Sequence, residues 1–222
     1  MNARVGGLLA RRWGVVPRAG LGLAALAGVI AALAGGLRGA EQLGGLATVD
    51  ISAVRIGTIG IGAAALLAWA SIASWPLWRE VGVGIATLLG VLLLLVVVGL
   101  RTDDALVPDV RVSLAGGGWL LVMAAIMAFA GLGIALVSGF VVRDELPRAL
   151  DEWPHVEKLA LVLAVAGIAL PPLAASGAAL GQHSRLGATA QRPLALVAVA
   201  GGIAVVALWA FGLLLGALWA QP

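Results

Sequence analysis

The two histidines are the residues of this chain best suited to hold a metal ion or a haem, because imidazole nitrogens are common ligands of both. They are His155 and His183, and 28 residues of continuous helix between them would span about 40 Å. Neither has a second nitrogen ligand nearby in the sequence. The sequence therefore predicts no metal site and no cofactor.

Three pairs of adjacent acidic residues could in principle support acid–base catalysis or hold a hard cation. They are Asp103-Asp104, Asp144-Glu145 and Asp151-Glu152. Adjacent residues on a helix point in different directions, so none of the pairs has the spacing of a working dyad. The chain has no cysteine, which excludes thiolate catalysis and disulfides. We therefore predict no catalytic residue and no enzymatic activity.

A predicted helix break is one place where function could lie. Pro171 and Pro172 interrupt the apolar run 156–178 and remove two backbone donors, and Ser176 follows them. A discontinuous helix could line a path for a small molecule or a lipid. The alternative is a kink whose backbone groups are satisfied by neighbouring helices. No predicted span contains an ionisable residue in its interior, which argues against a proton-coupled pump.

The segment 143–158 concentrates eight of the 25 charged residues. Within it Leu146, Leu150 and Trp153 follow one another at helical spacing. They predict a short interfacial helix with an apolar edge that could dock a partner. The alternative is a solvated loop whose tryptophan lies at the depth of the lipid headgroups.

Composition identifies the elements that must position these residues. Hydrophobic residues make up 62% of the chain, charged residues 11%, and the mean hydropathy is +1.09, values typical of a membrane protein. The net charge of +3 comes without a basic stripe, which argues against nucleic-acid binding. We predict an all-α, polytopic transmembrane helix bundle of about six spans. The spans are expected at 19–36, 56–75, 81–100, 116–140, 156–178 and 193–219.

The expected organisation begins with a basic cytoplasmic leader, residues 1–18, in which Arg4, Arg11 and Arg18 share a face that could lie on anionic lipid. A disordered flank is the alternative. The rest of the chain is expected as a four-span bundle at 19–140 with external loops at 37–55 and 101–113, a charged cytoplasmic connector at 141–158, and the last two spans at 156–222 with an external loop at 179–192.

Small residues recur four apart in several predicted spans, as at Gly20, Ala24 and Gly28 in the first and at Gly60 and Ala64 in the second. They predict close helix–helix contact, because backbones in lipid associate across small side chains. Eight lysines and arginines fall on the N-terminal side of the six-span arrangement and six on the other. The positive-inside rule then places both termini in the cytoplasm. Abundant Ala, Gly and Arg with one Lys indicate a bacterial cytoplasmic membrane.

These features together favour a non-catalytic integral membrane protein that acts as a scaffold or accessory subunit of a membrane assembly. Its expected partners are the lipid bilayer and either another membrane protein or a second copy of the chain. The alternative is a small-molecule or lipid transporter or permease component built on Pro171-Pro172. The sequence leaves open the partner, the substrate, and whether the Trp-Pro segments at 75–80 and 153–158 reflect an internal duplication.

Overall fold

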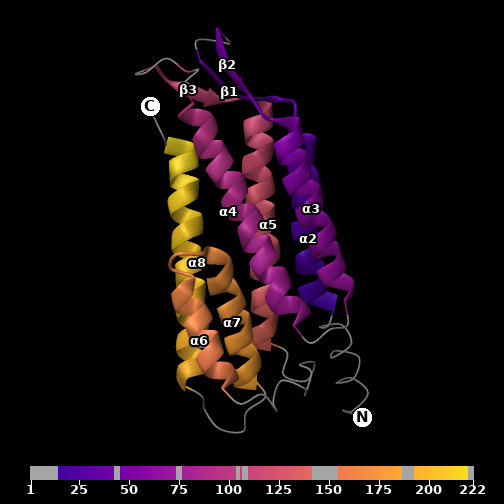
Figure 1. Ribbon diagram of the computed structural model, residues 1–222, viewed down its shortest axis with the longest axis vertical. Helices are drawn as coiled ribbons and strands as arrows, with labels where there is room; N and C mark the ends of the chain where they lie inside the picture. Colours follow the sequence, from indigo (N-terminus) through magenta and orange to yellow (C-terminus); the bar gives the residue numbers. More distant parts are fainter. Residues whose placement is uncertain are drawn as a thin grey trace.

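The chain folds as a bundle of helices with a small β-sheet over one end (Figure 1). The computed structural model describes residues 15–42, 46–73, 77–103, 106, 110–141, 155–186 and 193–219. The predicted helix-bundle fold is confirmed, and the sheet is a minor addition to it.

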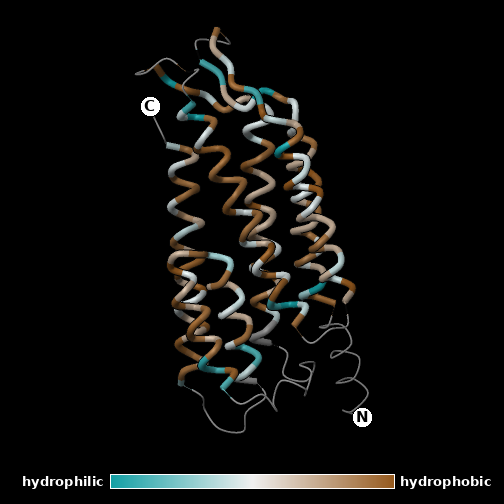
Figure 2. The backbone as a smooth tube through the Cα atoms, in the orientation of Figure 1, coloured by the Kyte–Doolittle hydropathy of each residue, from teal (hydrophilic) through white to brown (hydrophobic). Residues whose placement is uncertain are grey.

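Among the residues that the structure describes, five helices are long and apolar enough to cross a membrane. They are α2 (Val15–Leu33), α3 (Ala53–Ile72), α4 (Trp78–Arg101), α5 (Gly116–Val141) and α8 (Pro193–Trp219). At 1.5 Å per residue they reach about 28 to 40 Å, against a hydrocarbon core of about 30 Å. Hydrophobic residues follow them along most of their length (Figure 2). The chain is therefore a multi-pass membrane protein.

The segment predicted as the fifth span differs from the prediction. It forms two short helices, α6 (Val156–Ala166) and α7 (Pro171–Leu186), which pack against each other. The hairpin enters the bundle from one end and turns back near the middle (Figure 1). Pro171 and Pro172 open α7, where a missing N–H costs nothing because the first turn has no acceptor for it. With only 11 residues, about 16 Å, α6 cannot cross the membrane.

The bundle consequently has five full-length helices, and its two ends differ. We call the end where α6 begins the hairpin end, and the end that carries the β-strands the sheet end. The helix α2 begins at the hairpin end and α8 finishes at the sheet end (Figure 1). The prediction that both termini share one side required six crossings, so the observed arrangement does not support it. An apolar run of 23 residues satisfies the length rule for a span, but the rule does not register a fold-back.

The predicted close packing is present at two glycine pairs. A methyl group on Gly20 of α2 would lie 2.6 Å from the carbonyl oxygen of Gly131 of α5, and one on Gly28 would lie 2.5 Å from that of Gly60 of α3. The first half of α2 therefore packs against α5 and the second half against α3, each through direct backbone contact. By contrast, Gly212 of α8 has open space beside it.

Both of the predicted external loops at the sheet end contribute strands. The strands β1 (Arg38–Gln42) and β2 (Ala47–Asp50) form an antiparallel pair, and β3 (Val112–Leu114) adds to the other edge of β1. Ala40 pairs with both Val49 and Leu114 and is fully buried. The sheet therefore ties the loop after α2 to the loop before α5.

Candidate functional site

A buried group of polar side chains lies at the hairpin end, between the first turn of α4 and the inner face of α7. We call Arg79, Glu80, Ser176, Gln182 and His183 the polar cluster. Within it, Arg79, Glu80, Gln182 and His183 are each less than a tenth exposed. Ionisable side chains are costly in a membrane bundle and are found mainly where they serve a function. The polar cluster is therefore the candidate functional site.

Glu80 is the centre of the polar cluster. Its Oε1 lies 3.0 Å from Nδ1 of His183 and 3.7 Å from Nη2 of Arg79. The first distance is a hydrogen bond and the second is a looser ion pair. A carboxylate here is thus shared between an imidazole from α7 and a guanidinium from its own helix.

Three further hydrogen bonds attach α7 to the surrounding helices. Arg79 donates from Nη2 to the carbonyl oxygen of Ala179 at 2.9 Å. The hydroxyl of Ser176 donates to the main-chain carbonyl of Glu80 at 2.9 Å. The amide of Gln182 donates to the carbonyl of Leu136 on α5 at 3.0 Å. The second arm of the hairpin is therefore held by polar bonds as well as by packing.

Four atoms of the polar cluster are buried and have no hydrogen-bond partner among the described residues. They are Nε of Arg79, Oε2 of Glu80, Oε1 of Gln182 and Nε2 of His183. A buried polar atom without a partner costs free energy, and native proteins keep few of them. The cluster therefore has free donor and acceptor positions at which a proton, a water molecule or a small polar ligand could bind.

The local sequence explains why the cluster forms. The helix α4 begins at Trp78, which puts Glu80 in its first turn, where the helix dipole favours a negative charge. The twenty residues 81–100 have no charge and span about 30 Å, so Glu80 lies at the boundary of the hydrocarbon core. Gly84 leaves room for α7: a methyl group there would lie 2.6 Å from Oγ of Ser176.

The structure brings together one residue from the predicted path with others that the sequence interpretation placed elsewhere. Ser176 belongs to the polar cluster, whereas Pro171 and Pro172 form the first turn of α7, about one turn before Ser176. The proposed role of these three residues as a path stays a prediction. Arg18 is exposed at the start of α2, where it donates to the carbonyl of Ala73 at 3.3 Å and lies 5.3 Å from the ring of Trp78.

Five predicted site residues lie outside the described part of the chain. They are Arg4 and Arg11 of the leader and Leu146, Leu150 and Trp153 of the connector. Their predicted roles, binding lipid and docking a partner, stay predictions.

Two expectations about the ionisable residues were wrong. Arg79 and Glu80 fall between the second and third predicted spans, 56–75 and 81–100, but they lie inside α4 and are buried. His183 was assigned to an external loop, but it lies inside α7 and is 2% exposed. Because α7 runs back toward the hairpin end, His183 reaches Glu80, 103 positions earlier in the chain. The available signal was helical spacing: Ser176 and His183 are seven residues apart and share a face.

Comparisons with known proteins provide no further information about the polar cluster. The chain matches no protein-family model, no curated protein and no solved structure. Among the described residues no group of three or more histidines and acidic residues could hold a metal ion.

Proposed function

We propose that the protein is a non-catalytic component of a membrane transport system, in which Glu80 and His183 form a site that takes up and releases a proton. The observation that carries this proposal is the 3.0 Å contact between a buried carboxylate and a buried imidazole, each with one further atom that has no partner among the described residues. The substrate that moves with the proton belongs to the small-molecule or lipid class expected from the sequence.

The chemistry of the pair suits proton exchange. Histidine commonly acts as a proton shuttle or a pH sensor in proteins. A proton on His183 would strengthen the attraction between His183 and Glu80 and weaken the interaction of Glu80 with Arg79. Protonation therefore changes how α7 is held to α4.

The α6–α7 hairpin is the element that this change in protonation would move. The turn between α6 and α7 is attached to α8 by one side-chain bond, in which Nε1 of Trp209 donates to the carbonyl of Ile168 at 3.2 Å. Discontinuous helices that end inside the membrane are a recurring element of transporter sites. The proposal assigns this role to the α6–α7 hairpin, with the polar cluster as its proton-sensitive attachment.

The five-span arrangement also supports an orientation. The segments attached at the hairpin end, with the first turns of the helices there, carry ten of the 14 lysines and arginines. They are Arg4, Arg11, Arg12, Arg18, Arg79, Arg143, Arg148, Lys158, Arg185 and Arg192. The positive-inside rule places this end in the cytoplasm, here of a bacterial cell, with the sheet end outside. The margin of ten to four is wider than the eight to six that six spans would give.

The direct test is a pH jump on proteoliposomes, with the displaced charge recorded by solid-supported membrane electrophysiology. The wild-type protein is expected to give a transient charge movement as the cluster takes up protons. Glu80→Gln and His183→Gln are each expected to remove most of it. Pro171→Ala with Pro172→Ala is expected to leave proton uptake in place and to abolish substrate flux.

Matched controls exist at the same end of the bundle. Glu157→Gln and His155→Gln change a half-buried glutamate and an exposed histidine near the start of α6, and both should leave the charge movement unchanged. If the Glu80 and His183 variants keep the wild-type signal while their melting temperatures fall, the polar cluster is a structural attachment only and the transport proposal is wrong.

A scaffold role is the second candidate, and one feature of α8 favours it. Gly201 and Gly212 lie eleven residues apart on one face, and both have open space beside them. A second helix could approach closely along such a face. The mark of this function would be a membrane protein that co-purifies at a fixed ratio.

A further inference from the structure

An apolar groove opens between α5 and α8, with α4 as its floor, in the half of the bundle nearer the sheet. Its volume is about 320 Å³, and its lining includes Leu94, Ile126, Phe129, Ala207, Phe211 and Leu214. The groove exists because α7 packs between α4 and α8 only in the other half of the bundle. Beyond the end of the hairpin, no described helix takes its place.

A second cavity, of about 210 Å³, lies where α4 and α8 reach the sheet end. It is lined by Arg101 and Arg111 together with Val112, Leu218 and Trp219. The guanidinium of Arg101 donates to the carbonyls of Ala217 and Leu218, and at 2.7 Å to that of Val112. Its Nε is buried and has no hydrogen-bond partner among the described residues. The cavity is therefore cationic and keeps an unused donor.

The two cavities follow one another along α4 and α8, and we call the pair the track. Leu94 and Arg101 are seven residues apart on α4, and Phe211 and Leu218 are seven apart on α8, so each pair shares a helix face. Seven residues rise about 10 Å along the axis. A cavity lined by two arginines thus lies about 10 Å beyond the apolar groove, toward the sheet end.

We propose that this track binds one phospholipid of the leaflet at the sheet end, with an acyl chain in the groove and an anionic headgroup against Arg101 and Arg111. An apolar groove with two arginines beyond its end matches an amphiphile with a tail and a negative head, and basic pockets between transmembrane helices bind such headgroups. Trp219 is 77% exposed at the mouth of the cavity, at the depth where tryptophans meet lipid headgroups.

The shape of the track also argues against a membrane-crossing helix as its occupant. A partner helix that crosses the bilayer needs a contact face along its whole length. The groove occupies only one half of the bundle, because α7 fills the space beside α4 in the other half. A lipid of one leaflet needs no more than this half.

The test measures lipid binding to the purified full-length protein by native mass spectrometry, with phosphatidylglycerol and phosphatidylcholine of equal chain length as probes. The wild-type protein is expected to bind one phosphatidylglycerol more tightly than phosphatidylcholine. Arg111→Gln should weaken the binding of phosphatidylglycerol about fivefold and remove the preference between the two lipids. Ala207→Phe should displace both lipids, because its ring fills the groove.

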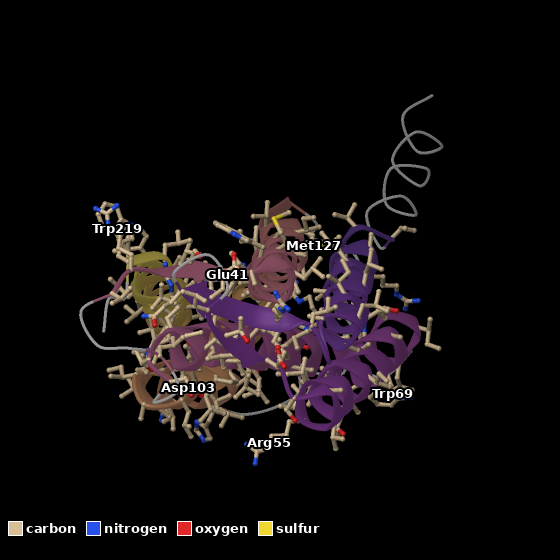
Figure 3. The ribbon with its side chains drawn as sticks, turned by 90° about the horizontal axis from the view of Figure 1, so that it is seen from above. Glu41, Arg55, Trp69, Asp103, Met127 and Trp219 are labelled. Carbon is tan, nitrogen blue, oxygen red and sulfur yellow. The ribbon has the colours of Figure 1, made fainter. Side chains whose placement is uncertain are left out.

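Each variant has a matched control away from the track. Arg55 is an exposed arginine at the same end of the bundle, and Figure 3 shows it on a different side from Trp219. Ala65 is an exposed alanine on α3, which does not line the groove. Arg55→Gln and Ala65→Phe should bind both lipids as the wild type does.

Two results would overturn the proposal. The first is a wild-type protein with no preference for phosphatidylglycerol, or an Arg111→Gln variant that keeps the preference. The second is a co-purifying polypeptide, and no lipid, that is displaced by Ala207→Phe. Arg111 is exposed and makes no hydrogen bond within the described part of the chain, so its substitution tests the headgroup contact even if Ala207→Phe lowers stability.

Discussion

The contact between Arg79 and Glu80 can be tested by a double-mutant cycle. The perturbations are Arg79→Met, Glu80→Gln and the two together. Both side chains are almost fully buried. Removing Glu80 leaves the charge of Arg79 without its counter-ion inside the bundle, and removing Arg79 leaves the carboxylate of Glu80 with only the imidazole of His183 beside it. Removing both leaves neither charge. The double variant should therefore be more stable than the sum of the two single effects predicts.

The magnitude follows from the geometry. Two unit charges at 3.7 Å attract by about 4 kcal/mol at an effective dielectric constant of about 20. Breaking a buried pair by removing one partner costs about 3 to 5 kcal/mol. We expect each single substitution to cost about 3 kcal/mol, and the coupling energy of the cycle to be about 2 to 4 kcal/mol.

The free energy of unfolding can be followed by tryptophan fluorescence during titration with SDS in mixed micelles, since the chain has eight tryptophans. The control cycle pairs Arg55→Met with Glu157→Gln, which change partly or fully exposed side chains on different helices. It should show effects below about 0.5 kcal/mol and no coupling.

Additive costs within about 0.5 kcal/mol would refute the reasoning. They would mean that Arg79 is held by the carbonyl of Ala179 alone, and that its charge does not reach the carboxylate.

Two further predictions concern packing and topology. Gly28→Ala should destabilise the protein by about 1 to 3 kcal/mol in the same unfolding assay, because the new methyl group would lie 2.5 Å from the carbonyl oxygen of Gly60. Gly22→Ala, where the space is open, should be neutral or stabilising by up to about 1 kcal/mol; equal costs at both positions would contradict the packing described. Single cysteines at positions 149 and 187 should react with a membrane-impermeant thiol reagent from the same side, and one at position 46 from the other. Labelling of positions 149 and 187 from opposite sides would contradict the fold-back and would mean that the segment between them crosses the membrane.

The five long helices were predictable because hydropathy and length determine them. The third predicted span, 81–100, lies inside α4 (Trp78–Arg101), and the last predicted span, 193–219, coincides with α8. The stripes of small residues correctly predicted close contact, although they did not say which helices meet. The sheet was missed because β1 is a short segment of mixed polarity with a glycine, which has no clear alternation.

The hairpin and the polar cluster depended on information that local patterns do not contain. Pro171 and Pro172 marked the break, but a kinked span and a fold-back have the same local sequence signal. Gln182 and His183 fell in the predicted external loop at 179–192. Only after α7 is known to run back beside α4 does His183 face Glu80. The candidate site therefore depends on the path of the chain, which brings α7 beside α4.

The half-membrane hairpin has a consequence for how the protein is made. The apolar run 156–178 is long enough to be inserted as an ordinary span, and its placement decides on which side of the membrane α8 begins. The bond from Trp209 to the turn at Ile168 forms only after α8 has been synthesised. A nascent chain that ends before α8 lacks this support for the fold-back. The fold-back therefore depends in part on a contact that only the helix after it can supply.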